Sequence, residues 1–535
     1  MKGAEQNGMP HASPSLWRPL RLPTFRNLLA ANVVSDIGAF MQNVGAAWLM
    51  ISFGAGPLYV ALTQTASSLP FFLLALPAGS FGDIVDRRKL ILFTETWMAI
   101  VAVVIAALTI SGLMSPWLLL VLTFALSAGD AFEAPTWRAI LPELVQKEDL
   151  AAASALNGIE FNFARAVGPA LAGLVIAAAN VATAFVVNVV SFFGVIFVIA
   201  RWKRPIRTRT TPAETVTGAT VAAIRYIRYS PAIRAVLLRQ GVTMFFASGL
   251  LALLPTVARG VSQSAMSYGL FLGLFGAGAV LGALILQPAR SRFSLEAVVT
   301  SGVVVVGMTT IATGRLQAMS ALGAVMLIAG AAWIIFVSLI SALMQTLAPD
   351  WVRARVLAVF LLVFQGSIAA GSATWGFVGQ HVGVRSALLY AGLGTIASVA
   401  LRLGFALPDA SSDMSPWYHW RTPVILKEIG LEVDEGPVLV TVEYVVAHQH
   451  STEFVKLIHK YSRVRRRDGA SRWGIFRDTA AESRYLEVFL VQSLAEHLRQ
   501  HERLTQADRE LEKRLHSYVE GDPKVHHLIY ANLQD

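Results

Sequence analysis

Four ionisable side chains lie deep inside long apolar stretches of this sequence: Asp36, Asp130, Glu160 and Arg165. Charged groups within a membrane-spanning segment are costly and usually have a function. A rise of 1.5 Å per residue places Asp36 and Glu160 about 13 Å, Asp130 about 9 Å and Arg165 about 21 Å from the same membrane edge. We expect the three carboxylates to bind and release protons, with Arg165 reaching back toward them. The alternative is that the four groups form structural ion pairs.

The elements that must position these groups are membrane-spanning helices. The chain has 535 residues, of which 55% are hydrophobic and 15% charged, whereas soluble proteins have about 25% charged residues. Apolar runs of 18 or more residues are long enough to cross a bilayer. We predict an all-α polytopic membrane protein with about a dozen spans, whose cores are 27–53, 58–82, 90–112, 116–136, 151–178, 181–200, 233–256, 266–288, 295–314, 318–345, 355–379 and 384–406.

The positive charges between these spans predict the topology. Cytoplasmic connections carry an excess of lysine and arginine. The basic connections follow the second, sixth, eighth and tenth spans, and they contain Arg87 to Lys89, 201–209, Arg290 with Arg292, and Arg353 with Arg355. We therefore place both termini in the cytoplasm and the protein in the cytoplasmic (inner) membrane, in contact with the lipid bilayer.

The net charge of +10 does not indicate nucleic-acid binding. Up to Leu407 there are 27 basic and 14 acidic residues, and beyond it 17 and 20. The basic excess thus belongs to the membrane part, where it orients spans and meets anionic lipid. Cysteine is absent, which excludes disulfides and thiolate metal sites, and we expect no cofactor and no metal.

The apolar runs and the composition between them divide the chain into six parts. We predict a disordered cytoplasmic tail at 1–22, an N-terminal six-span half at 23–200 and a basic cytoplasmic linker at 201–231. A C-terminal six-span half at 232–407 follows, then a second linker at 408–436 and a small cytoplasmic domain at 437–535. Two six-span halves in tandem are a known transporter architecture, with substrate handled between them.

The last hundred residues lack an apolar run of membrane length and read as an α+β domain. Alternating and charged patterns predict strands at 438–446, 472–477, 485–491 and 525–530, a helix at 453–467 and one long helix at 494–518. This β-α-β-β-α-β order is typical of a ferredoxin-like fold.

The charged turn between the second and third spans reads Gly79-Ser-Phe-Gly-Asp83-Ile-Val-Asp86-Arg87-Arg88-Lys89, and it resembles the signature loop of the major facilitator superfamily. It departs from that signature at Ile84, where Arg is usual, and at Asp86, where Gly is usual. Three further stretches resemble the branch that contains the enterobactin exporter and macrolide-efflux-type proteins: 135–145, 157–173 and 349–357. The resemblance covers roughly residues 15 to 407.

The resemblance and the chemistry of the turn together imply a gate. Gly79 and Gly82 let two helices approach closely, and Asp83 can face the positive N-terminus of the eleventh span. The gate would also involve Asp86, Arg87, Arg88, Arg353 and Arg355. We expect Arg87 and Arg88 to pair with carboxylates across the two halves in one conformation. The alternative is that these cations only enforce topology.

Two further groups of residues are assigned from their positions in the spans. Gly168 and Pro169 resemble part of an exporter-associated pattern, or they form a packing kink without directional meaning. We predict a substrate cavity lined by amides and aromatic rings: Asn32, Gln42, Trp48, Gln240, Trp333 and Gln365. Such a lining suits an amphiphilic organic molecule.

The last domain resembles the antibiotic-biosynthesis-monooxygenase-like fold through 465–470 and 493–505. The resemblance implies a regulatory or dimerising appendage, while an enzymatic role has to be considered because relatives include cofactor-free oxygenases. His497 and His501 share a helix face and could hold a metal, but a third ligand is not evident and a solvated or dimer-packing face is the preferred reading.

These observations favour a secondary active transporter that is not an enzyme. We expect a proton-coupled exporter of an amphiphilic small molecule, such as a siderophore, a macrolide or another drug, working by alternating access. The alternatives are an importer of the same fold and a membrane-anchored enzyme that uses the C-terminal domain.

Overall fold

The computed structural model describes residues 15–202, 216–408 and 436–530. Within these ranges, ten helices are long and apolar enough to cross a membrane. Helices α1 and α2 stand outside that group of ten, but they have 30 and 28 residues. The predicted tail at 1–22 and both predicted linkers fall partly outside the described residues.

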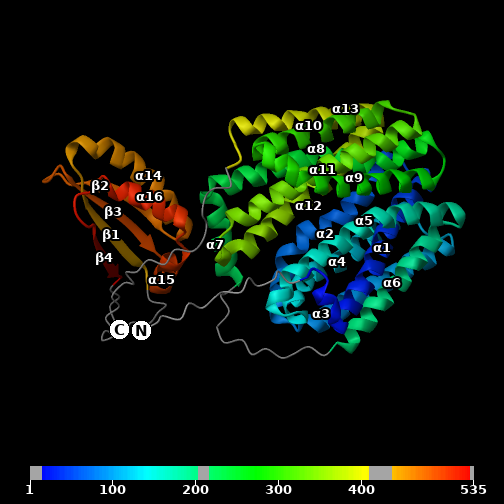
Figure 1. The fold of residues 1–535 in the computed structure, drawn as a ribbon, viewed down its shortest axis with the longest axis horizontal. Helices are drawn as coiled ribbons and strands as arrows, with labels where there is room; N and C mark the ends of the chain where they lie inside the picture. Colours follow the sequence, from blue (N-terminus) through cyan, green and yellow to red (C-terminus); the bar gives the residue numbers. More distant parts are fainter. Residues whose placement is uncertain (1–14, 203–215, 409–435, 531–535) are drawn as a thin grey trace, which may run out of the picture. The chain divides into compact units, whose positions relative to one another are not determined.

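Two sets of six long helices correspond to the two predicted halves (Figure 1). The N-terminal half consists of α1 (Pro23–Ser52), α2 (Pro57–Ile84), α3 (Arg87–Ile110), α4 (Pro116–Leu144), α5 (Leu150–Ala178) and α6 (Val181–Arg201). The C-terminal half consists of α8 (Pro231–Val261), α9 (Ala265–Arg292), α10 (Leu295–Arg315), α11 (Met319–Leu347), α12 (Asp350–Val382) and α13 (Val384–Ala397). The helices agree with the predicted span cores to within a few residues at most ends, and the all-α membrane fold is confirmed.

Local sequence determines where several of these helices begin. Asp86, Ser115 and Asn180 precede α3, α4 and α6, and each side chain accepts a hydrogen bond from a backbone N–H of the first turn. This capping satisfies donors that have no partner inside the helix. Proline also stands in the first turn of α1 and α4, where its missing N–H costs nothing.

The chain divides into two compact units whose boundary passes through three helices. One unit contains residues up to 210, 241–337 and 361–400, and the other contains 211–240, 338–360 and 401–535. The second unit thus includes α7 (Val216–Tyr229) and the adjoining ends of α8, α11 and α12. Helix α7 lies in the segment 201–231, which was predicted as a basic cytoplasmic linker. Its buried Ala222, Ala223 and Tyr226 follow helical spacing, a signal that the prediction did not use.

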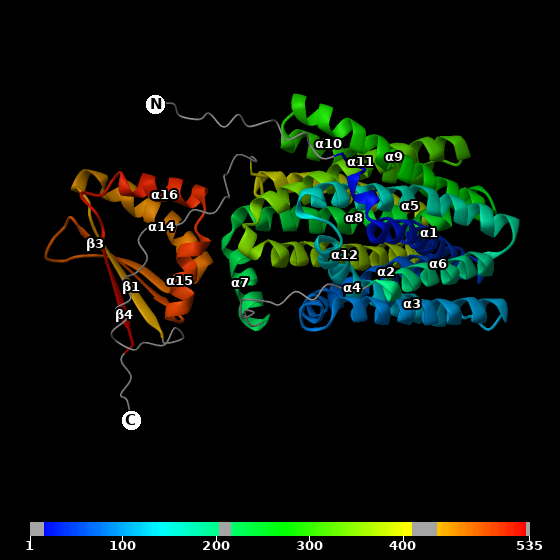
Figure 2. The ribbon, with the colours of Figure 1, turned by 60° about the horizontal axis from the view of Figure 1, so that its bottom comes forward.

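The C-terminal part is a four-stranded antiparallel sheet with helices on one face (Figure 2). It contains β1 (Val438–Val445), α14 (Ser451–Asp468), β2 (Ser471–Arg477), β3 (Arg484–Val491), α15 (Leu494–Arg503), α16 (Gln506–His516) and β4 (Lys524–Ile529). The strand order β2-β3-β1-β4 and the alternation with helices match a ferredoxin-like topology. The predicted strands and the first helix are confirmed to within two residues.

One helix prediction in this domain is wrong. The segment 494–518 forms two helices, α15 and α16, which are separated at Leu504 and Thr505. The Thr505 side chain caps α16, and the Asp508 carboxylate accepts a hydrogen bond from the Thr505 N–H at 3.0 Å. This reciprocal capping box is a helix-start signal, and it begins a new helix inside a run of helix-forming residues.

Candidate substrate cavity and buried charges

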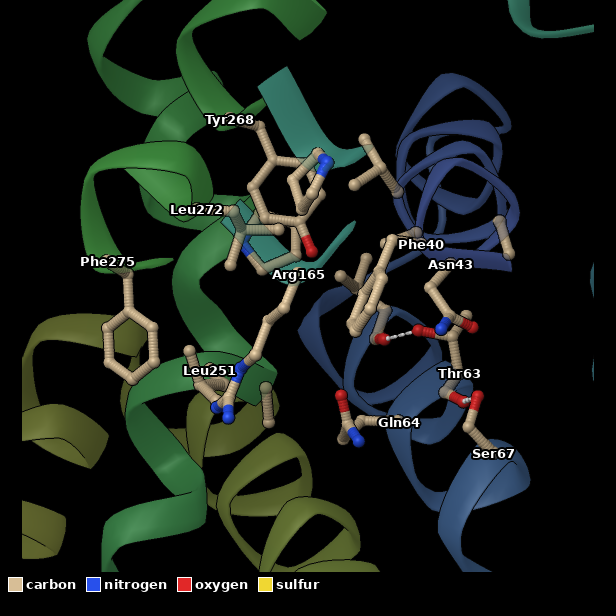
Figure 3. Close-up of a pocket in the computed structure, with 17 residues that line it drawn as sticks. Phe40, Asn43, Thr63, Gln64, Ser67, Arg165, Leu251, Tyr268, Leu272 and Phe275 are labelled. Carbon is tan, nitrogen blue, oxygen red and sulfur yellow. Dashed lines mark hydrogen bonds between the residues drawn. The ribbon is translucent and has the colours of Figure 1, made fainter. Parts of the chain in front are cut away.

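A cavity of about 210 Å³ lies between helices of the two halves (Figure 3). Helices α1, α2 and α5 contribute one side, and α8 and α9 contribute the other. The lining residues are Phe40, Asn43, Val44, Ala46, Ala47, Val60, Thr63, Gln64, Ser67, Arg165, Pro169, Leu251, Ala252, Pro255, Tyr268, Leu272 and Phe275. Aromatic rings and a few polar groups around a concave space are typical of a small-molecule site.

Close helix contacts join the two halves at the end of the bundle that holds the α1–α2 and α5–α6 connections. A Cβ atom at Gly269 of α9 would lie 2.5 Å from the Pro169 carbonyl oxygen and 2.7 Å from Gly173 Cα of α5. At the same end, Arg259 Nη1 donates to the Ile51 carbonyl at 2.6 Å. Small residues let membrane helices approach this closely, and these contacts bring the halves together beside the cavity.

Arg165 projects into the cavity from the middle of α5 (Figure 3). Its guanidinium carbon lies 5.9 Å from the Phe275 ring centroid. Among the residues that the structure describes, no carboxylate forms an ion pair with it. Glu160 is five positions earlier on the same helix, which is a rotation of about 140° and places it on another face. The predicted association of Arg165 with the carboxylates is therefore absent from this conformation of the described chain.

The carboxyl groups of Asp36 and Glu160 lie within hydrogen-bond reach of each other. They come from α1 and α5, so the structure brings together two residues that the sequence separates by more than a hundred positions. Asp130 of α4 is exposed and interacts electrostatically with Asp36. The three predicted carboxylates thus form one cluster.

A second carboxyl pair lies next to this cluster, and its member Glu95 was missed in the sequence. Glu95 of α3 is 4% exposed and Glu133 of α4 is 8% exposed, and their carboxyl groups lie within hydrogen-bond reach. The Thr94 hydroxyl donates to Glu133 Oε2 at 2.7 Å. Glu95 stands inside the third apolar run, so the rule that selected Asp36 would also have selected it.

Arg87 and Arg88 of the predicted gate make their described contacts within the N-terminal half. Arg87 Nη1 forms an ion pair with Glu143 Oε1 of α4 at 2.8 Å, and the Arg88 guanidinium donates to the carbonyls of Ile199 and Ala200 at the end of α6. These contacts differ from the predicted pairing across the halves, because Glu143 ends α4 directly beside the start of α3. The surroundings of Gly79 and Gly82 and the side chain of Asp83 lie outside what the structure describes.

Two other residues of the predicted gate make local hydrogen bonds among the described contacts. Asp86 caps α3 by accepting the Lys89 N–H at 3.1 Å. Arg353 Nε donates to the Ala348 carbonyl at 3.0 Å, and Arg353 and Arg355 have further partners. The gating role of this set stays a prediction.

Gly168 and Pro169 both lie where α5 meets other helices. A Cβ atom at Gly168 would lie 2.7 Å from Phe40 Cβ, so the glycine allows α1 and α5 to pack closely. Pro169 lines the cavity. A directional role for the pair stays a prediction.

None of the six predicted cavity residues is among the described residues that line the cavity. Their places are as follows: Asn32 is buried, Gln42 accepts from Asn188 of α6, Trp48 packs in an apolar core, Gln240 donates to the Phe360 carbonyl, Trp333 is buried against Phe275, and Gln365 is half-buried on α12. For the residues of α1 the reason is helix rotation, because the face of α1 at the cavity includes Phe40, Asn43, Val44 and Ala47. Gln42 and Trp48 lie on other faces of that helix. Trp333 and Gln365 stand on α11 and α12, which contribute no described residue to the lining.

In the second unit, an ion pair joins α7 to the C-terminal domain. Arg225 Nη2 pairs with Glu496 Oε1 at 2.7 Å, and Arg503 Nη1 pairs with the same oxygen at 2.7 Å. Although burial opposes the effect, hydrogen bonds and charge from Arg503 and Arg225 lower the pKa of Glu496. The Arg467 guanidinium lies 5.2 Å from the Tyr226 ring centroid. Helix α7 is therefore part of the C-terminal domain's packing.

His497 belongs to the interior of the C-terminal domain. It is 3% exposed, with Nδ1 3.1 Å from Gln500 Oε1 and its ring centroid 4.7 Å from that of His527. Burial lowers the pKa of His497 to about 4. The His501 side chain lies outside the described residues, and a cluster of three metal-binding side chains is not found in the described part of the chain. Dimerisation through this domain stays a prediction.

Residues 14–535 match the family model described as "Transmembrane secretion effector". The chain is 25% identical over 390 residues to an uncharacterized MFS-type transporter of Bacillus subtilis, covering 69% of this chain and 91% of the relative. It is 26% identical to the enterobactin exporter EntS of Salmonella typhimurium, covering 49% of this chain and 63% of the relative. A staphyloferrin A transporter of Staphylococcus aureus is 26% identical, over 29% of this chain and 40% of its own length.

Solved structures share the fold of the membrane part. The nucleoside transporter NupG matches with a TM-score of 0.61 and 11% identity, covering 73% of this chain and all of the other. A bacterial homologue of the iron transporter ferroportin, in the inward-facing state, matches with a TM-score of 0.56 and 15% identity, covering 73% of this chain and 99% of the other. At these identities the likeness concerns the fold alone.

Proposed function

Because the chain belongs to the transmembrane secretion effector family, whose members are transporters of the major facilitator type and not enzymes, we propose that it is a proton-coupled exporter of an amphiphilic small molecule. The substrate would be a siderophore, a macrolide or another drug. The two six-helix halves would expose one central cavity to each side of the membrane in turn.

The observation that carries this proposal is the arrangement of the cavity and the carboxyl cluster. The cavity takes walls from both halves, so a rocking motion of the halves changes its access. Asp36 and Glu160 stand on α1 and α5, which also line the cavity, and Asp130 stands on α4. Asp36 is four residues before Phe40, which lines the cavity, a rise of about 6 Å along α1. Proton binding is thereby close enough to influence occupancy of the cavity.

The pairing of the carboxyl groups supports proton exchange. Two carboxyl groups within hydrogen-bond reach repel each other when both are ionised and attract when they share a proton. Asp36 with Glu160 and Glu95 with Glu133 are two such pairs. Asp130 interacts electrostatically with Asp36 and would take part in the same proton exchange. We assign Asp36, Asp130 and Glu160 to proton coupling. Glu95 and Glu133 would be a second, neighbouring pair that binds protons.

The charge pattern and the named relatives support a direction of transport and an orientation. The excess of basic residues in the connections after α2 and α6 favours a cytoplasmic side for these ends and for both termini. The contacts around Gly173, Gly269 and Arg259 then close the extracytoplasmic end, as in an inward-facing state that accepts substrate from the cytoplasm. Localisation in the inner membrane agrees with an exporter.

The test is uptake by everted inner-membrane vesicles from cells that express the protein. The substrate is first found by comparing the drug and siderophore-precursor sensitivity of deletion and complemented cells. Export predicts accumulation inside the vesicles that a protonophore collapses, and the Asp36→Asn with Asp130→Asn double variant should lose uphill accumulation while it retains downhill exchange. Accumulation in right-side-out vesicles instead would make the protein an importer. Full uphill efflux by the double variant would remove the carboxyl cluster from the mechanism.

A further inference from the structure

Arg165 is the cationic group in the wall of the cavity, and the described part of the chain gives it no counter-ion. It stands 15 residues into the 29-residue helix α5, about 22 Å along the helix from its start. At that depth the guanidinium is far from either membrane surface. An arginine guanidinium stays protonated, and a charge at membrane depth is costly to leave uncompensated. Arg165 is half-buried in the cavity wall. Its position therefore calls for an anion that arrives with the substrate.

The groups around Arg165 are suited to an anionic head group. The side chains of Gln64 and Asn43 supply amide donors, and Tyr268 supplies a phenol, all within the cavity wall (Figure 3). Phe275 lies 5.9 Å from the guanidinium carbon and Phe40 lies across the cavity, so an aromatic or aliphatic body would contact rings. A planar guanidinium binds a carboxylate with two parallel hydrogen bonds.

The described carboxylates nearest to Arg165 along the chain and in the cluster are engaged elsewhere in this conformation. Asp36 and Glu160 interact with each other, and Glu95 with Glu133. The nearest along α5, Glu160, faces about 140° away. The cavity volume of about 210 Å³ is below the roughly 300–1,000 Å³ of a site for a whole drug-sized molecule. The cavity would thus enclose the charged head of an amphiphile and leave its remainder outside.

We infer that Arg165 is the anion-recognising residue of the substrate site, and that the exported molecule carries a carboxylate or an equivalent oxyanion on an aromatic or aliphatic body. This inference rests on the proposed function, because it assigns the substrate class of the same cavity. It adds a residue and a chemical class that the transport cycle alone does not require.

The test is equilibrium binding to the purified full-length protein in lipid nanodiscs, without a proton gradient. The probes are 1-naphthoate and its methyl ester, which differ in charge and share the ring. Wild type should bind the carboxylate at least about tenfold more tightly than the ester, and Arg165→Gln should bind both equally. Arg165→Lys, which keeps charge and loses the planar fork, should retain part of the preference. Arg201→Gln is the matched control, because Arg201 also lies over a phenylalanine ring, at 4.0 Å from Phe197, and is outside the cavity lining.

Two results would overturn the inference. The first is equal binding of the carboxylate and the ester by the wild type. The second is an unchanged preference for the carboxylate in Arg165→Gln, provided that this variant still binds the ester and elutes as a monodisperse species. The proposed function fails separately, in the vesicle experiment, because binding needs no gradient. Carboxylate preference without proton-driven transport would leave Arg165 as an anion site and reject proton coupling.

Discussion

Adding one methyl group at Gly269 should separate the two halves at the end where they touch. Gly269 faces α5 so closely that a Cβ atom would lie 2.5 Å from the Pro169 carbonyl oxygen, 2.7 Å from Gly173 Cα and 2.9 Å from Gly173 N. Carbon atoms are most stable about 3.5–4.0 Å apart, so α5 and α9 must part by roughly 1 Å. The obstructing atoms are backbone and cannot rotate away. Overpacking of this kind costs about 1–3 kcal/mol, which corresponds to a 5- to 150-fold shift between two conformations.

The absence of cysteine in the chain gives a direct assay for this shift. Ser67→Cys places a thiol in the cavity wall, where a membrane-impermeant maleimide added on either side reports access. Gly269→Ala should speed labelling from the side of the α1–α2 connection by about 5- to 150-fold and slow labelling from the other side. Gly260→Ala is the control, because a Cβ atom there meets nothing within 4 Å. Equal labelling of the Gly269→Ala and parent proteins, with both folded, would refute the claim that this contact holds the described conformation.

Two further predictions concern the C-terminal domain. Burial lowers the pKa of His497 to about 4 in the folded protein, against 6.5 for the free side chain. Between these pH values the unfolded state binds a proton that the folded state does not. The free energy of unfolding therefore falls as the pH is lowered from about 6.5 toward 4, by at most about 3 kcal/mol. Hydrogen exchange of β1 and β3, corrected for intrinsic rates, should show this loss, and His497→Gln should reduce it. Separately, Arg225→Glu should lower the protection of α7 by about 1–3 kcal/mol, because it removes the ion pair with Glu496 and places a second carboxylate beside it. Unchanged protection in Arg225→Glu would mean that the ion pair does not hold α7.

The sequence predicted the fold closely because the relevant signals are local. Apolar runs of membrane length mark helices wherever they occur, and period-two alternation marked β1 and β3 with Tyr444 and Phe489 among their buried positions. The two errors have local causes as well. The Thr505–Asp508 capping box divides a helix-forming run, and α7 lies in a segment whose basic, threonine-containing start was taken for a flexible linker.

The site was predicted less well because it depends on helix rotation and on pairing between distant helices. The rule that buried ionisable groups have a function found Asp36 and Glu160, and these two side chains meet in the structure. The rule does not state which way a residue faces, so Gln42 was placed in the cavity while Asn43 and Gln64 form its wall. An amide on a largely apolar helix has no local signal for its direction.

An anionic substrate makes the proposed exchange electrogenic, which gives the coupling a signature of its own. One proton entering as one monovalent anion leaves moves two positive charges inward, worth about 4.6 kcal/mol per 100 mV at about 2.3 kcal/mol per charge. A cation exchanged one-for-one for a proton moves no net charge. An inside-positive potassium diffusion potential in everted vesicles, without a pH gradient, should therefore drive accumulation of a carboxylate substrate, and Arg165→Gln should abolish it. Accumulation that follows the pH gradient and ignores the potential would show that the transported species carries compensating positive charge, which Arg165 in the cavity wall would repel.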